Sequence, residues 1–454
     1  MDMEKCVPRF LLAGANSGCG KTTVTCAVLR ALVDRGLRVG ACKCGPDYID
    51  PMFHSQITGG RSANLDPFFF APDTARYLLA RNSGDRDVTV IEGVMGYYDG
   101  AGPAGDRAST YEAAWSTASP VVLVIGARGM GLSALAVLQG FLDFQPNSGI
   151  RGVIFNQCTA GTYRLLAETL PKRFGGRVRP LGYLPPMREC SLESRHLGLV
   201  TAGEVSDLEE KLQRLARQAE ETIDLDGLLA LAAEAPALTF PLPSPLPSLG
   251  RARIAVARDK AFCFYYEDSL DVLRDMGAEL VDFSPLADTS LPPDIQGLYL
   301  GGGYPELYAR QLSENATMRT SIRTALAGGL PCIAECGGFM YLTEAIGDFP
   351  MVGHLPGKCF DAGRLVRFGY VTLTARRDNL LCRAGESVRG HEFHHWDCTD
   401  PGEGFLAEKA TGRNWPCAVA TDRLYAGYPH FHFRANPAFA RRFYETCLKE
   451  RHTI

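Results

Sequence analysis

A proline-rich segment near the middle of the chain limits what the protein can fold into. Residues 235–250 read APALTFPLPSPLPSLG, with five prolines in sixteen positions. Proline fixes φ and lacks a backbone N–H, so this run favours an extended, semi-rigid connector over a helix or an inner strand. The chain's 454 residues are also too many for one hydrophobic core. We therefore predict two domains, 1–234 and 251–454, joined by the connector 235–250.

Both halves alternate apolar runs of strand character with helical segments. In the first half we expect strands over 9–14, 88–92, 120–125 and 150–156, a helix over 22–34, and a closing helical stretch over 208–231. In the second half we expect strands over 252–257, 278–283, 297–300 and 331–334. Strands that alternate with helices indicate parallel sheets covered on both faces. The predicted fold class is α/β, with two doubly wound domains.

The composition is that of an ordinary globular protein, with 46% hydrophobic residues, 22% charged residues and a net charge of −4. This balance argues against nucleic-acid and membrane partners. No apolar run reaches the roughly 20 residues of a membrane span, and the first residues lack signal-peptide features, so we expect a cytoplasmic location. The 15 cysteines are expected to be thiols. Cys42 and Cys44 have no second pair to complete a zinc site, and their roles stay open.

The stretch GANSGCGKTT at 14–23 lies between an expected strand and an expected helix. Glycines let backbone N–H groups turn toward phosphate oxygens, lysine reaches the terminal phosphates, and a threonine hydroxyl binds magnesium. The spacing departs from GxxxxGK[ST], because five residues separate the first and last glycines of the pattern. A glycine turn beside a solvated lysine is the alternative. We predict a nucleotide-binding loop with these candidate contacts: Gly14, Ser17, Gly18, Gly20, Lys21, Thr22 and Thr23.

Two further segments carry the carboxylates that a nucleotide-bound magnesium ion needs. KCGPDYIDPMFH at 43–54 places Asp47 and Asp50 beside a Gly-Pro turn, and VTVIEGVMGYYDG at 88–100 places Glu92 at the end of a strand. Ligands of open α/β sheets gather at this edge, and Mg²⁺ prefers oxygen donors. Taken alone, the sequence DYID at 47–50 would be interpreted as a solvated turn. With Glu92 present, we predict a magnesium site of Thr22, Asp47 and Glu92, with Asp50 as an outer or substrate contact.

The stretch AECGGFMYL at 334–342 places a cysteine between an apolar strand and two glycines. A sharp strand-to-helix turn would lift Cys336 clear of the sheet, and Gly337 would let the backbone close without a clash. The N-terminus of the following helix would also lower the pKa of the thiol. The pattern predicts a nucleophile, and a buried structural thiol is the alternative.

A thiol that attacks an amide needs a base and donors for the oxyanion. GGGYPE at 301–306 follows an expected strand, so the backbone N–H groups of Gly301, Gly302 and Gly303, with Gly337, are the candidate contacts for the oxyanion and its substrate. The base is expected from YAGYPHFHF at 425–433, which offers His430 and His432. Strand packing would explain either histidine taken alone.

Together with SRHLGLVTAGE at 194–204, these motifs resemble the cobyrinic acid a,c-diamide synthase family, in order and over nearly the whole chain. The resemblance implies a P-loop domain similar to dethiobiotin synthetase and a flavodoxin-like class I glutamine amidotransferase domain. It implies ATP and Mg²⁺ as cofactors, with magnesium bound by Asp47 and Glu92. It places the corrinoid acetate groups near Tyr48 and Ile49. One departure is AxCxG, where class I amidotransferases usually show GxCxG.

The resemblance also favours His430 over His432 as the base. Many class I domains carry a glutamate two residues after the histidine, and here that position is His432 itself. The orienting acid is therefore missing or supplied from elsewhere. RGHEFHHWD at 389–397 resembles the family's RGHEFHYS motif. It is either a core turn in which Glu392 and His394 bond each other or part of a contact between the domains near the acceptor.

The implied function is ATP- and glutamine-dependent amidation of the a and c carboxylates of cobyrinic acid, through acyl phosphates, in cobalamin biosynthesis. The expected partners are L-glutamine and a corrinoid or related tetrapyrrole acid. A homodimer, the identity of the tetrapyrrole and the order of the two amidations stay open. The alternatives within the class are hydrogenobyrinate and nickel-sirohydrochlorin diamidation. The alternative from another class is a nucleotide-switch ATPase with a degenerate amidotransferase-like tail, which an intact Cys336 with candidate histidines disfavours.

Overall fold

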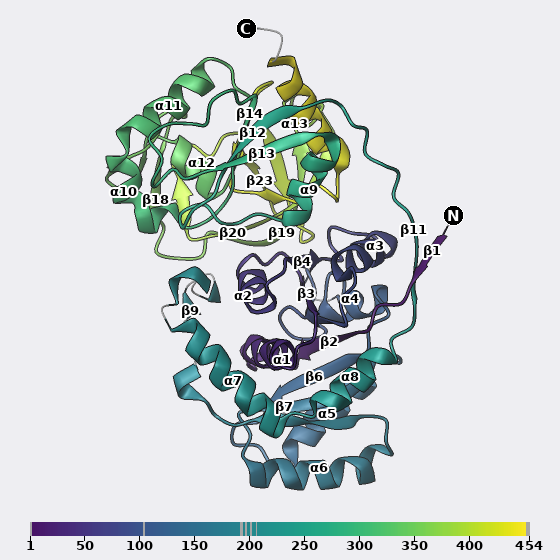
Figure 1. Ribbon diagram of the computed structural model, residues 1–454. Coiled ribbons are helices and arrows are strands. Elements are labelled where there is room, and N and C mark those ends of the chain that lie inside the picture. The colour runs from purple at the N-terminus through teal and green to yellow at the C-terminus, as the bar shows by residue number, and fades with distance from the viewer. Residues whose placement is uncertain are drawn as a thin grey trace. The chain divides into compact units, whose positions relative to one another are not determined.

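The computed structural model describes residues 2–102, 105–190, 194–195, 198–199, 202–205 and 207–450. The chain divides into two compact units, Met1–Pro243 and Ser244–Ile454 (Figure 1). The division falls inside the segment that the prolines predict to be a connector. Part of that segment forms a strand, because β11 (Leu238–Pro241) pairs antiparallel with β1 (Asp2–Lys5). The motif at 194–204 lies partly outside the described residues.

The first unit is built on a seven-stranded sheet in the order β4-β3-β5-β2-β6-β7-β8, with every neighbouring pair parallel. Its strands are β2 (Arg9–Gly14), β3 (Val39–Cys44), β4 (Ser62–Leu65), β5 (Val88–Glu92), β6 (Val121–Gly126), β7 (Ile150–Asn156) and β8 (Arg179–Leu184). Strands β2 and β5 are buried throughout, as expected for a parallel sheet covered on both faces. The strand predictions for this half are confirmed to within a residue.

Helices cover this sheet, and α1 packs against α2 and α7. The helices are α1 (Lys21–Asp34), α2 (Ile49–Thr58), α3 (Pro72–Ser83), α4 (Thr110–Ser116), α5 (Ser133–Phe144), α6 (Ala160–Phe174), α7 (Leu208–Thr222) and α8 (Leu225–Ala233). The helical stretch expected over 208–231 is broken. Asp224 lies between α7 and α8, and its carboxylate accepts a hydrogen bond from the Gly227 N–H at 2.8 Å, which starts a second helix. Short elements η1 (Arg188–Cys190), β9 (Ser194–Arg195), β10 (Gly198–Leu199) and η2 (Ala202–Glu204) precede α7.

The second unit has a six-stranded sheet in the order β13-β12-β14-β15-β25-β24, parallel except for β24. The strands are β12 (Ala252–Ala257), β13 (Ala278–Phe283), β14 (Gly297–Leu300), β15 (Cys332–Glu335), β24 (Val419–Ala420) and β25 (Leu424–Gly427). Side chains alternate between two cores: Ile254 and Val256 belong to one, and Ala255 and Ala257 to the other. Helices α9 (Glu267–Met276) and α13 (Pro437–Lys449) pack on the first core, and α10 (Ala309–Glu314), α11 (Ala316–Ala327) and α12 (Gly337–Leu342) on the second.

Two further sheets between α12 and α13, antiparallel except for the β16–β18 pair, were not anticipated from the sequence. A four-stranded sheet contains β16 (Ala345–Ile346), β17 (Phe349–Pro350), β18 (Lys358–Asp361) and β21 (Trp396–Cys398). A five-stranded sheet contains β19 (Arg367–Ala375), β20 (Ser387–His394), β22 (Phe405–Glu408), β23 (Asn414–Cys417) and β26 (His430–Phe431). The η3 turn (Pro305–Tyr308) follows β14. The fold class is confirmed as α/β in both units. In the described part of the chain, no helix has both the length and the apolar character needed to cross a membrane.

Candidate functional sites

The nucleotide loop joins β2 to α1 at the carboxyl edge of the first sheet. Gly18 and Gly20 have φ values of 82° and 85°, a conformation that favours glycine. Helix α1 begins at Lys21, so the backbone N–H groups of its first turn lack partners within the helix and can receive phosphate oxygens. The Lys21 side chain is buried with Nζ 3.4 Å from the carbonyl oxygen of Met95. Burial, with Lys43 nearby, lowers the pKa of Lys21.

Asn156, at the end of β7, holds this loop in place, and sequence reasoning did not identify it. Its side-chain amide donates to the carbonyl oxygen of Cys19 at 2.9 Å. A Cβ added at Gly20 would lie 1.9 Å from the same amide nitrogen, so only glycine fits there. The one signal in the sequence is that Asn156 ends a strand at the edge where ligands of parallel sheets bind.

A buried polar cluster lies beside the loop, centred on Glu92 at the end of β5. Glu92 is 0% exposed, and its carboxylate contacts the Thr22 hydroxyl at 2.6 Å, Lys43 Nζ at 3.0 Å and His54 Nε2 at 2.7 Å. Asp50 Oδ2 contacts Lys43 Nζ and lies 3.4 Å from the Thr22 hydroxyl. The structure thus brings Thr22, Glu92 and Asp50 together. Lys43 and His54 are members of the cluster that sequence reasoning missed.

The charges in this cluster depend on one another. Burial acts to raise the pKa of Glu92, but Lys43 and His54 outweigh it and hold the pKa well below its usual value. Burial also acts against the charge on Lys43, yet Asp50 and Glu92 raise its pKa. Burial, with Asp47 and Glu92 nearby, raises the pKa of Asp50. Lys43 is thus the cation that keeps Glu92 charged in this buried cluster.

The predicted contacts at the start of α2 take different positions. Asp47 Oδ1 accepts hydrogen bonds from the N–H groups of Ile49 and Asp50, at 2.8 and 3.1 Å, so this carboxylate helps to start the helix. Asp50 rather than Asp47 makes the contact with Thr22. Tyr48 and Ile49 are 8% and 6% exposed. Among the described residues there is no group of three or more His, Cys, Asp or Glu able to hold a metal ion, so a magnesium ion here would need phosphate or water oxygens as well.

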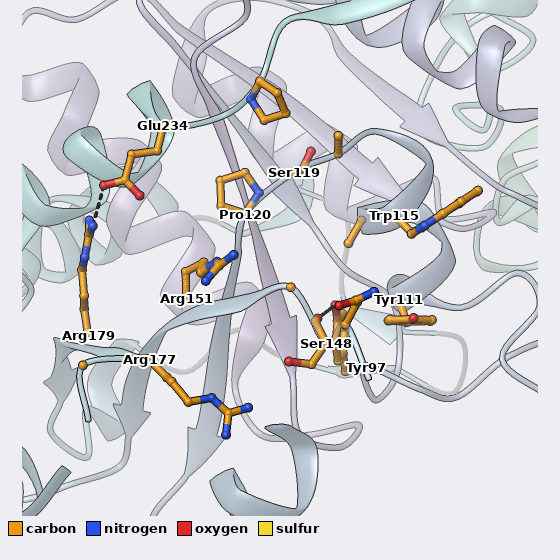
Figure 2. Close-up of a pocket in the computed structure, with 16 residues that line it drawn as sticks. Tyr97, Tyr111, Trp115, Ser119, Pro120, Ser148, Arg151, Arg177, Arg179 and Glu234 are labelled. Atoms are coloured by element: carbon orange, nitrogen blue, oxygen red, sulfur yellow. Dashed lines mark hydrogen bonds and ion pairs between the residues drawn. The ribbon is translucent and has the colours of Figure 1, made fainter. Parts of the chain in front are cut away.

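A separate cavity of about 620 Å³ opens at the amino-terminal edge of the same sheet (Figure 2). Pro120, Gly149 and Arg179, which precede or begin β6, β7 and β8, contribute to its wall. Arg179 is paired with Glu234 at 2.5 Å. None of the predicted site residues lines this cavity, which lies at the opposite edge from the nucleotide loop.

In the second unit, Cys336 occupies a sharp turn between β15 and α12. Its φ of 49° and ψ of −100° are strained for a residue with a side chain. Its N–H donates to the Gly427 carbonyl oxygen at 2.7 Å. The glycines that follow are required by space, because a Cβ at Gly338 would lie 2.2 Å from the Leu300 carbonyl oxygen and one at Gly337 would lie 2.9 Å from Cδ of Pro305. This geometry is that expected of a nucleophile turn.

Two expectations about Cys336 need correction. The turn does not display the thiol to solvent, since the residue is only 8% exposed. Its pKa is also raised rather than lowered. Burial is the main cause and the nearby carboxylate of Glu306 adds to it, while the hydrogen bond from the Gly337 N–H acts the other way but is smaller. The thiol is therefore protonated at neutral pH and needs a base.

The glycine loop after β14 lies next to this turn. Gly303 has a φ of 155° and a Cβ there would lie 2.1 Å from the Ala261 carbonyl oxygen. The Gly301 N–H donates to the Tyr265 hydroxyl at 2.8 Å, which engages it away from an oxyanion. A Cβ at Gly302 would lie 2.5 Å from Cε1 of His430. Gly302 and Gly303 are thus the loop residues placed beside His430 and Gly337.

The two candidate histidines have different surroundings. His430, on β26, is 3% exposed and lies beside Gly302, with Nδ1 3.2 Å from Glu335 Oε2. His432 instead packs on the ring of Tyr266, with ring centroids 4.6 Å apart, and its Nδ1 accepts the Arg434 N–H at 3.2 Å. Burial, with Arg434 nearby, lowers the pKa of His432 to about 3. These surroundings favour His430 as the base, in line with the sequence prediction.

The motif at 389–397 forms the end of β20 and its continuation. Glu392 Oε2 and His394 Nε2 are 3.6 Å apart, longer than a hydrogen bond. The ring of His394 stacks on Tyr428, with centroids 3.9 Å apart. His391 Nε2 lies 2.9 Å from the Tyr266 hydroxyl. The side chains therefore pack within the second unit, and a role in contact between domains stays a prediction.

Comparisons with known proteins match both parts of the chain to described families. Residues 10–200 match the family model of the CobQ/CobB/MinD/ParA nucleotide binding domain, and residues 253–438 match that of the CobB/CobQ-like glutamine amidotransferase domain. The cobyrinate a,c-diamide synthase of Thermoplasma volcanium is 41% identical over 452 residues, covering 98% of each chain. Those of Dehalococcoides mccartyi (strain CBDB1) and Priestia megaterium are 40% and 38% identical, covering 96% and 97% of this chain and 97% of each relative. The chain therefore belongs to the cobyrinate a,c-diamide synthase family.

Proposed function

We propose that this protein uses ATP and L-glutamine to amidate the a and c carboxylates of cobyrinic acid. The observation that carries the proposal is the likeness to cobyrinate a,c-diamide synthases, at 41% identity over 452 residues, which spans both units and both sites. A match restricted to one unit would support only nucleotide binding or only glutamine hydrolysis.

In the second unit, the Cys336 sulfur attacks the side-chain amide carbon of glutamine while His430 takes the thiol proton. The same proton then passes to the departing nitrogen, which leaves as ammonia, and water hydrolyses the thioester to glutamate. The backbone N–H groups of Gly302 and Gly303 receive the oxyanion. Because burial raises the pKa of Cys336, the reaction depends on a base close to the thiol.

In the first unit, the γ-phosphoryl group of ATP passes to a substrate carboxylate. A carboxylate is a poor electrophile, whereas its acyl phosphate loses phosphate readily when ammonia attacks. Lys21 and the N-terminus of α1 hold the phosphates. Mg²⁺ would offset the charge of these phosphates. Thr22, Glu92 and Asp50 are the residues that would hold it, with Asp47 as the further predicted ligand.

Recognition of the tetrapyrrole is proposed to involve the start of α2, where Tyr48, Ile49 and Asp50 lie beside the polar cluster. A homodimer and a cytoplasmic location remain predictions from the sequence, and a measured molecular mass in solution tests the first.

Mass spectrometry tests the proposed substrate. The purified protein is incubated with ATP, magnesium, glutamine and, in separate reactions, cobyrinic acid, hydrogenobyrinic acid or nickel sirohydrochlorin. Two successive replacements of OH by NH₂ on cobyrinic acid alone support the proposal. Diamidation of either of the other two in preference to cobyrinic acid reassigns the substrate, and no amidation of any of them contradicts the proposed function.

A further inference from the structure

Glu335, the residue before the nucleophile, lies against the base. It ends β15, where it pairs in register with Gly427 of β25, and the chain reaches His430 three residues after Gly427. The Glu335 Oε2 and His430 Nδ1 atoms are 3.2 Å apart, and the two side chains are only 2% and 4% exposed. A carboxylate and an imidazole that share a water-poor site interact strongly.

The other oxygen of this carboxylate is also held. The Tyr299 hydroxyl, on the neighbouring strand β14, donates to Glu335 Oε1 at 3.2 Å. The carboxylate therefore has one oxygen for Tyr299 and the other for His430. Such a second contact fixes the orientation of the acid, as supporting hydrogen bonds do in other histidine sites.

The His430 ring is oriented from both of its edges. Its Nδ1 faces Glu335, and its opposite edge faces the glycine loop, where a Cβ at Gly302 would lie 2.5 Å from Cε1 and 3.4 Å from Nε2. If Nδ1 carries the proton, its N–H donates a hydrogen bond to the carboxylate. Nε2 is then unprotonated, and its lone pair lies on the side of Gly302.

We propose that Glu335 is the positioning residue that orients His430 and fixes its tautomer. This inference rests on the proposed role of Cys336 and His430 in glutamine hydrolysis. Glu335 takes the part of the acid that many class I domains place two residues after the histidine, a position that here holds His432. The acid comes instead from the residue that precedes the nucleophile.

The proton movements balance with this assignment. The S–C bond forms as the Cys336 S–H proton moves to Nε2 of His430, and the imidazolium that results carries a second proton on Nδ1. Glu335 keeps its negative charge and stabilises that cation. The Nε2 proton then passes to the departing nitrogen as the C–N bond breaks, and the neutral imidazole returns.

His391 also contacts His430, but it cannot supply the charge. The two rings stack with centroids 5.0 Å apart and planes 16° apart. Burial, with His430 and His432 nearby, lowers the pKa of His391 well below its usual value, so it is neutral. Its contact limits rotation of the His430 ring, whereas the negative charge comes from Glu335.

The test compares Glu335→Gln with the wild type in two assays. For the glutaminase reaction we expect kcat to fall at least about 100-fold, the effect expected when a general base is misoriented. The KM for glutamine should change little, because Glu335 acts through His430 and does not touch the substrate. Ammonium-driven amidation should be unchanged. Glu344→Gln removes the charge of an exposed glutamate beyond the end of α12 and serves as the matched control.

A wild-type kcat in Glu335→Gln would overturn the inference. So would a rise in KM that matches the fall in kcat, since a general disturbance of the site predicts that pattern. If Glu335→Gln does not fold, Glu335→Asp replaces it. Aspartate keeps the negative charge but holds it one methylene further from His430. An unchanged kcat in that variant would overturn the inference. Cys336→Ala separates the two levels of argument: if it retains glutaminase activity, the proposed function of this site fails rather than the role of Glu335.

Discussion

Replacing Lys43 by methionine should destabilise the first unit strongly, because Lys43 is the cation that two buried carboxylates share. Its ammonium group lies 3.0 Å from Glu92 Oε1, contacts Asp50 Oδ2 and is 3% exposed. At an effective dielectric constant of about 20, one such contact corresponds to about 5 kcal/mol of Coulomb attraction. The desolvation of lysine offsets part of this, so we expect a net loss of about 3–5 kcal/mol near neutral pH.

The loss should depend on pH in a definite direction. In the wild type the pKa of Glu92 is held below its usual value, so its ionisation stabilises the fold above the pKa of the unfolded chain, and this stability is lost as the pH falls through the folded value. Without Lys43, Glu92 and Asp50 repel each other in a buried site and take up a proton more readily. The penalty is therefore largest at high pH and shrinks as the pH falls toward 5.

Native-state hydrogen exchange measures this effect unit by unit. Amides of β5 (Val88–Glu92) report the opening free energy of the first unit, and amides of β12 (Ala252–Ala257) provide the internal comparison in the second. Arg38→Met is the control, because Arg38 pairs with Asp85 and Asp87 at the surface and its removal should change exchange little. A loss below about 1 kcal/mol for Lys43→Met, or a loss independent of pH, would refute the reasoning.

Three further substitutions test the other sites. Gly302→Ala places a methyl group 2.5 Å from Cε1 of His430, so glutaminase activity should fall at least about 100-fold while ammonium-driven amidation persists; equal loss of both would contradict this. Gly20→Ala combines a φ of 85° with a contact of 1.9 Å to the Asn156 amide, so ATP affinity measured by calorimetry should fall, and normal affinity would argue against the loop geometry. Glu92→Gln should abolish ATP-dependent amidation with either nitrogen source but leave glutaminase activity, a separation that paired assays detect.

Local patterns made the nucleotide loop and the cysteine turn predictable. Gly18, Gly20 and Lys21 are close in sequence and flanked by a clear strand and helix, so the loop could be located without distant contacts. The glycines after Cys336 likewise have a local steric reason, since Gly338 faces the Leu300 carbonyl oxygen. Alternating strands and helices similarly indicated the parallel sheets.

Residues that act across strands could not be found in this way. Lys43, His54 and Asn156 reach their partners through contacts between separate strands and helices, and nothing in their immediate neighbours marks them. Glu335 adjoins the cysteine in the sequence, but its contact with His430 depends on the register of β15 and β25.

Two further features could not be predicted from local sequence: the pKa of the Cys336 thiol and the later strands of the second unit. The helix N-terminus suggested a lowered pKa for Cys336, whereas burial, which depends on the packed structure, raises it. The strands from β16 to β23, mostly antiparallel, are short or lack intervening helices, so a search for strands alternating with helices passed over them.

The central claim is that the thiol of Cys336 releases the ammonia that amidates a carboxylate activated by ATP. The most direct measurement follows cobyrinic acid by mass spectrometry with the Cys336→Ala protein, ATP and magnesium, comparing glutamine with an ammonium salt as the nitrogen source. We predict that ammonium still supports diamidation at the wild-type rate and that glutamine supports none. Continued turnover with glutamine, or loss of turnover with ammonium in a folded protein, would contradict the account.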